Sequence, residues 1–193
     1  MTLRGFSELS LISRVGPSPR HILSLHCLQS LAVSSCKNLR SLFSMEIHRS
    51  LPELTSFRVY NCHELEQIIE ENEELVSNTE VCFPKLTDIR VVNCKKMKSL
   101  FSVAMIRMLP KLSTLEISEV TQLEEVFKGE NTINDVEIGL VNLSSIQLHK
   151  LPCFVDICKV FKLRTSKIKH VDIVECPKIA PSLREIQVIT PLL

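Results

Sequence analysis

Apolar residues recur along this chain in a fixed phrase, apolar-x-x-apolar-x-apolar. The clearest copies begin at Leu54, Leu86 and Leu112. The other copies begin at Leu28, Leu143, Ile168 and, in shortened form, Leu183. The end of the phrase alternates apolar and other residues, which is the pattern of a strand with one buried face. We therefore expect one short strand per copy, with its apolar residues in a core and the intervening residues on the opposite face.

The copies are spaced like the units of a repeat protein. Most lie roughly 25 to 32 residues apart, and an inward Cys or other apolar residue follows each phrase at a fixed distance. Together these positions give the L-x-x-L-x-L-x-x-N/C-x-L pattern of leucine-rich repeats. We predict an α/β leucine-rich-repeat solenoid, a horseshoe arc with a concave parallel sheet of about seven strands and an irregular or short-helical convex side.

The repeat domain is expected to span residues 25–193, with about six repeats and a terminal strand after Leu183. Residues 1–24 fit poorly, because a first copy at 6–11 would place Arg14 at the inward position and Gly16-Pro-Ser-Pro19 would then break the chain. We expect these residues to form a degenerate or frayed N-terminal edge. The runs 45–51 and 103–109 each end at Leu-Pro and predict short convex helices.

Cysteine usage indicates a reduced, cytoplasmic protein. The chain has eight Cys, and four of them occupy the same inward repeat position: Cys36, Cys62, Cys94 and Cys176. Burial as small apolar side chains explains this placement without disulfides. We find neither the uninterrupted apolar region of a signal peptide nor a run of 18 apolar residues, so the sequence predicts no membrane segment.

Motifs for catalysis or cofactor binding are missing from the sequence. The four Gly are scattered, so no phosphate-binding loop is expected, and no His-Glu-x-x-His, Cys-x-x-Cys or Gly-x-Ser-x-Gly occurs. His63 follows Cys62, but the register places Cys62 in the core and His63 on a turn, which argues against a zinc site. We expect no enzyme activity, no metal and no cofactor. The formal net charge of +1 gives no support to nucleic-acid binding.

The concave face is the candidate recognition surface. Seven strands would make a face roughly 30 Å wide, enough for a protein interface of about 800 Å² per partner. The candidate protein-binding residues are Arg58, Tyr60, Asp88, Arg90, Glu116, Gln147, His149, His170 and Asp172. Arg58 and Arg90 would be neighbours, a repulsive arrangement that Asp88 or an acidic partner is expected to offset. Tyr60, the only Tyr in the chain, is the best single contact residue because Tyr is enriched in binding hot spots.

Charge also alternates between repeats. An acidic stretch at 64–80 precedes a basic stretch that contains Arg90, Lys95, Lys96 and Lys98. Stacking would bring the two stretches together, so we expect internal charge compensation in preference to an acidic docking surface.

Several motifs resemble one family. They are Leu-Pro-x-Leu-x-x-Phe/Ile-x-Val-x-x-Cys-x-x-Leu, Ser-Leu-Phe-Ser, Phe83-Pro-Lys-Leu86 after an acidic insertion, and Leu123-Glu-Glu-Val-Phe127. They are similar to the C-terminal repeats of plant coiled-coil NBS-LRR disease-resistance proteins, over about residues 25–190. The resemblance implies a segment of an intracellular immune receptor that senses pathogen effectors or host proteins they modify. It also implies contact with the nucleotide-binding domain of the same receptor, which helps to hold the receptor inactive.

Other protein classes share parts of this pattern. The substrate-recruiting repeats of F-box ubiquitin ligases also carry Cys-type repeats, but with more regular spacing and an N-terminal F-box, neither of which is visible here. An extracellular receptor would favour Leu-x-Gly-x-Ile-Pro, which is absent, and the only glycosylation sequon is Asn142-Leu-Ser144. A free-standing adaptor or a truncated product is a further alternative.

Overall fold

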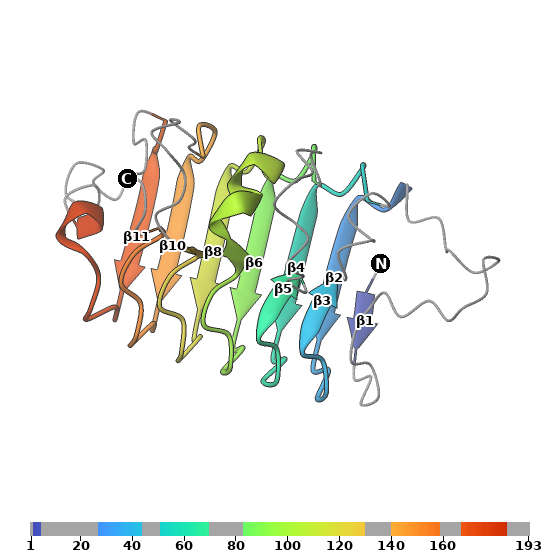
Figure 1. The fold of residues 1–193 in the computed structure, drawn as a ribbon, viewed down its shortest axis with the longest axis horizontal. Coiled ribbons are helices and arrows are strands. Elements are labelled where there is room, and N and C mark those ends of the chain that lie inside the picture. The colour runs from blue at the N-terminus through green and yellow to red at the C-terminus, as the bar shows by residue number, and fades with distance from the viewer. Residues whose placement is uncertain are drawn as a thin grey trace.

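A computed structural model describes residues 2–4, 27–43, 51–69, 83–129, 140–158 and 167–184. Its main feature is one parallel sheet whose strands stand side by side along the molecule (Figure 1). In spatial order the strands are β1 (Thr2–Arg4), β2 (Ser30–Ser34), β4 (Ser56–Tyr60), β6 (Asp88–Val92), β8 (Thr114–Ser118), β10 (Ser145–His149) and β11 (His170–Val174). The six five-residue strands are those that the repeat predicts.

Alternating burial explains why these segments are strands. In β4, β6, β8 and β10 the second and fourth residues are buried and the others are not. On β8, for example, Leu115 and Ile117 are fully buried, whereas Glu116 lies on the opposite face. Fully burying a Leu or Ile stabilises the fold by about 1.5–3 kcal/mol. The predicted division between a core face and a concave face is therefore confirmed.

The residue directly after each five-residue strand adopts a left-handed conformation. These residues are Ser35, Asn61, Asn93, Glu119, Lys150 and Glu175, with φ between 54° and 57°. In all but the last, the N–H still donates to the end of the next strand, as Asn93 N does to Ser118 O at 2.9 Å. The chain then turns inward, which buries the next residue: Cys36, Cys62, Cys94, Val120, Leu151 or Cys176. Asn tolerates this conformation best, and Asn93 Nδ2 also donates to Asn61 Oδ1 at 2.8 Å.

A ladder of hydroxyl groups joins the repeats at the start of the strands. Thr55 Oγ1 donates to Gln29 O at 2.8 Å, and Thr87 Oγ1 donates to Thr55 O at 3.0 Å. Ser113 and Ser144 continue the ladder at 3.1 and 3.2 Å. Each hydroxyl therefore reaches the equivalent carbonyl of the preceding repeat. The sequence carried a signal for this ladder, since all four donors occupy the same repeat position.

The side of the core away from the concave face holds short elements. β3 (Ser41–Phe43) pairs with β5 (Gln67–Ile69), and β7 (Phe101–Ser102) pairs with β9 (Phe127–Lys128), both in parallel. The predicted helix after Ser99-Leu-Phe-Ser102 is present as the 3-10 helix η4 (Val103–Met108), which ends before Leu109-Pro110. The companion helix predicted over 45–51 falls almost entirely outside the described residues. The small strands were not predicted, and they close the core opposite the main sheet.

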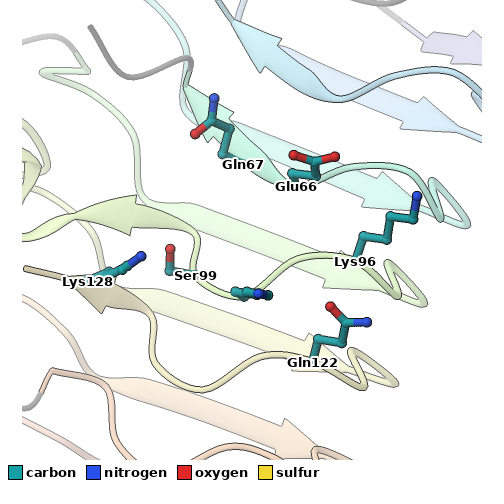
Figure 2. Close-up of a pocket in the computed structure, with 7 residues that line it drawn as sticks. Glu66, Gln67, Lys96, Ser99, Gln122 and Lys128 are labelled. Atoms are coloured by element: carbon teal, nitrogen blue, oxygen red, sulfur yellow. The ribbon is translucent and has the colours of Figure 1, made fainter. Parts of the chain in front are cut away.

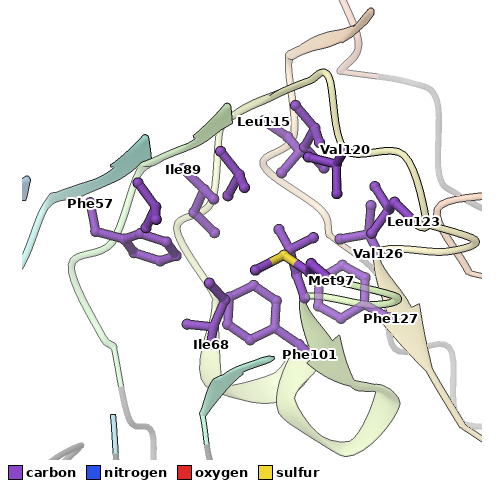
Figure 3. Close-up of a cluster of buried hydrophobic side chains, with 14 of the residues drawn as sticks. Phe57, Ile68, Ile89, Met97, Phe101, Leu115, Val120, Leu123, Val126 and Phe127 are labelled. Atoms are coloured by element: carbon purple, nitrogen blue, oxygen red, sulfur yellow. The ribbon is translucent and has the colours of Figure 1, made fainter. Parts of the chain in front are cut away.

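Aromatic rings tie the two sides of the core together. Phe57 on β4, Phe101 on β7 and Phe127 on β9 lie in one buried cluster (Figure 3). The rings of Phe57 and Phe101 meet edge to face with centroids 6.5 Å apart. Those of Phe101 and Phe127 stack at 5.6 Å. Because these residues come from three successive repeats, the core is continuous along the solenoid.

The two ends of the sheet differ from the repeat-based expectation. Residues 2–4 pair with β2 as strand β1, which the spacing of apolar residues did not predict. The rest of the N-terminal edge predicted over 1–24 lies outside the described residues, so that boundary stays a prediction. Residues 181–184 form one helical turn with Leu183 buried. The strand predicted after Leu183 also lies outside the described residues.

Candidate functional site

Side chains on the concave face form three columns that cross the strands. In the central column, neighbouring strands align Ala32, Arg58, Arg90, Glu116, Gln147 and Asp172. One flanking column contains Ser30, Ser56, Asp88, Thr114, Ser145 and His170, and the other contains Ser34, Tyr60, Val92, Ser118, His149 and Val174. All nine candidate binding residues therefore lie on this one face of the sheet.

Arg90 is held by its neighbours on both adjacent strands. Its Nη2 lies 2.7 Å from Glu116 Oε1 on β8, and its guanidinium lies over the Tyr60 ring of β4, 5.8 Å from the ring centroid. Cation–π contacts of this kind favour a fixed guanidinium. The positive charge next to Arg58 is therefore offset by Glu116.

Asp88 does not provide the compensation that we expected from it. Among the described residues, its carboxylate forms no ion pair with Arg58 or Arg90. Instead it lies next to the Thr87 hydroxyl, whose single proton is shared between Asp88 Oδ2 and Thr55 O. Sequence reasoning placed Asp88 correctly on the face. It could not choose between two acidic residues that both neighbour Arg90, because that choice depends on side-chain reach.

A second polar pair lies at the other end of the face. His149 Nε2 on β10 is 2.8 Å from Asp172 Oδ2 on β11, and both side chains are partly exposed. A carboxylate only accepts hydrogen bonds, so the His149 ring nitrogen is the donor. Gln147 separates this pair from the Arg90–Glu116 pair in the central column. The concave face therefore presents a row of polar side chains, and the other face of the sheet packs on the buried apolar core.

A polar groove of about 430 Å³ lies away from the concave face. Its lining residues come from three successive repeats: Glu66, Gln67, Lys96, Lys98, Ser99, Gln122 and Lys128. Figure 2 shows their side chains along neighbouring turns of the solenoid. The expected charge compensation occurs at one point here, where Lys96 Nζ lies 2.6 Å from Glu64 Oε2. The rest of the acidic stretch, beyond residue 69, lies outside the described residues.

The inward cysteines form a column of free thiols inside the core. Cys36, Cys62, Cys94 and Cys176 are all buried and unbridged. Burial raises the pKa of Cys62 to about 11 and that of Cys94 to about 12, and it also raises the pKa of Cys176. Because the thiolate is the reactive form, Cys62, Cys94 and Cys176 are expected to react slowly. They serve as small apolar side chains, as the repeat position predicts.

We expect alkylation to separate these thiols by burial. Iodoacetamide at about pH 8 should modify exposed Cys27 before Cys62 and Cys94, which stay protected until urea unfolds the chain. The raised pKa values of Cys62 and Cys94 also predict that the free energy of unfolding of the protein falls as pH rises above about 9. In that range the thiols ionise in the unfolded chain, whereas the buried thiols stay protonated. Peptide mass spectrometry measures the order of labelling. Equal rates for Cys27 and Cys94 in the folded protein would contradict the inward register.

Two further features bear on the kind of site. Among the described residues, no group of three His, Cys, Asp or Glu side chains could hold a metal ion, and Cys62 is buried whereas His63 is exposed. Within the same part of the chain, no helix has both the length and the apolar character to cross a bilayer.

A family model described as plant disease resistance protein RPS2-like, leucine-rich repeats, matches residues 1–63 and 63–185. No curated protein and no solved structure matches the chain.

Proposed function

Because the chain belongs to the family of RPS2-like plant disease resistance leucine-rich repeats, we propose that it senses pathogen effectors, or host proteins that effectors modify. In this proposal it is the recognition segment of an intracellular immune receptor, and the nucleotide-binding domain of that receptor is its second partner. Leucine-rich-repeat domains bind proteins and are typically non-catalytic. The observation that carries the proposal is the family match, which covers most of the chain.

The concave face supports this role by its rigidity and its chemistry. Its backbone is fixed on a core of fully buried Leu, Ile, Val and Phe side chains, so little order has to be gained on binding. Tyr60, Arg58 and Arg90 supply the residue types that carry most binding energy in protein interfaces. The remaining positions are mainly short polar side chains, which leave room for a partner to approach the sheet.

The proposal is tested with purified protein and a defined panel of secreted pathogen proteins and their host targets. We expect at least one panel member to bind. Gln147→Trp, which places a large ring at the centre of the face, should weaken that binding by roughly tenfold or more. Lys111→Trp is the matched control, because Lys111 is exposed on a turn before β8. Biolayer interferometry gives both affinities.

Two results would count against the proposal. One is a panel in which no protein binds the folded chain. The other is a bound protein whose affinity falls for Lys111→Trp and not for Gln147→Trp, which would move recognition from the concave face to the turns.

A further inference from the structure

Arg58 differs from the other charged residues of the central column. Arg90 is paired with Glu116, and Asp172 is paired with His149. Arg58 is exposed and has no ion pair or hydrogen bond to its side chain among the described residues. We infer that Arg58 is the point at which this face binds a carboxylate of the recognised protein, an inference that rests on the proposed function.

The surroundings of Arg58 suit an incoming carboxylate. Its neighbour on β2 is the short side chain of Ala32, which leaves the guanidinium open on that side. Next to it, the hydroxyls of Ser30 and Ser56 lie 3.0 Å apart and add polar groups at the same level of the face. In the opposite flanking column lies Tyr60, whose ring already lies beneath Arg90. A guanidinium with one open side can present two parallel N–H groups to the two oxygens of a carboxylate.

The local charge also favours an anion at Arg58. Arg90 lies beside it on β6 and adds positive potential, although Glu116 offsets much of that charge. Asp88 is the nearest acidic residue by register, opposite Ser56, and its carboxylate lies next to the Thr87 hydroxyl. Arg58 is the only charged residue of the central column that is left unpaired among the described residues. One Asp or Glu side chain of a partner would pair with it.

The polar groove that lies away from the concave face offers a competing location for acidic ligands. It contains Lys96, Lys98 and Lys128, but Glu66 lines the same groove and Lys96 is already paired with Glu64. Lysine also lacks the planar fork that matches a carboxylate. The concave face is therefore the stronger candidate, and the experiment compares the two sites directly.

The test uses a phage-displayed library of random peptides selected against the folded chain. We expect the selected peptides to be enriched in Asp and Glu. Binding of a synthetic copy should fall by roughly tenfold for Arg58→Gln, with partial recovery in Arg58→Lys, because Lys restores the charge and not the two-pronged contact. Replacing its acidic residue by Asn or Gln should cause the same loss in the wild type and little further loss in Arg58→Gln.

Three control variants separate the possible outcomes. Arg40→Gln removes an exposed Arg from a turn, and Lys98→Gln removes a cation from the groove. The double variant Lys85→Gln, Glu53→Gln removes an exposed charge pair from two turns outside the concave columns without changing net charge. Binding should survive all three. If Lys98→Gln lost peptide binding and Arg58→Gln kept it, the peptides would bind in the groove and the inference would be overturned. Selected peptides without acidic enrichment would overturn it as well.

The inference and the proposed function fail in different ways. If selected peptides bind wild type and Arg58→Gln equally but are lost in Gln147→Trp, the concave face remains the recognition surface and the role of Arg58 is wrong. If Gln147→Trp and Arg58→Gln both bind the peptides as well as wild type, the peptides bind outside the concave face and the inference about Arg58 is wrong, whereas the panel of pathogen proteins and host targets decides the proposed function.

Discussion

Phe101→Ala is expected to lower the free energy of unfolding by about 3–5 kcal/mol, the usual cost of truncating a buried aromatic residue. Phe101 lies between Phe57 of the main sheet and Phe127 of the small β7–β9 sheet, and its ring contacts both. Removing it leaves a cavity in the middle of the stack, where the core of one repeat meets that of the next. Urea denaturation followed by circular dichroism measures the change.

The matched control is Lys128→Ala on β9, whose side chain is exposed. It should change stability by less than about 0.5 kcal/mol. The loss of stability in Phe101→Leu should lie between those of Phe101→Ala and Lys128→Ala, because Leu keeps most of the buried volume. If Phe101→Ala were no more destabilising than Lys128→Ala, Phe101 would not be a core residue and the convex strands would not close the solenoid.

Leu115→Ala is the second large effect, with an expected loss of about 2–5 kcal/mol. Leu115 is fully buried on β8, and the register places Ile89 and Ile146 beside it on the two neighbouring strands. In a solenoid each repeat is stabilised mainly by its neighbours. The truncation therefore weakens two inter-repeat contacts at once.

Thr114→Ala provides the control for Leu115→Ala on the same strand. Thr114 faces the concave side and is only partly buried, so its loss should cost little. Equal melting temperatures for Leu115→Ala and wild type would remove Leu115 from the core. Such a result would also shift every concave column by one residue, because the side chains of a strand alternate between its two faces.

The repeated phrase predicted the main sheet well for a physical reason. A strand with one buried face has a period of two, and six copies in the same register leave little freedom for the columns. The positions of Arg58, Arg90, Glu116 and Gln147 followed directly. The left-handed turn could also have been anticipated at Asn61 and Asn93, since Asn favours that conformation.

Other features were beyond this kind of reasoning. The short strands around Phe43 and Phe101 are only two or three residues long, which is too short for periodicity to assign. The partner of Arg90 depends on which carboxylate can reach it, and the structure gives Glu116 in place of Asp88. The groove beside Lys98 is formed by three repeats together. Each of these depends on three-dimensional neighbours that no single repeat specifies.

A protein partner is proposed to bind the concave face, and the only Tyr of the chain offers a direct probe of that binding. Protein made with 3-fluorotyrosine should give a single ¹⁹F resonance, which reports on position 60 in the flanking column of that face. We expect the resonance to shift or broaden as a bound member of the effector or host-protein panel is added, with saturation at the affinity measured independently. An unchanged resonance at full occupancy would contradict binding across this part of the face.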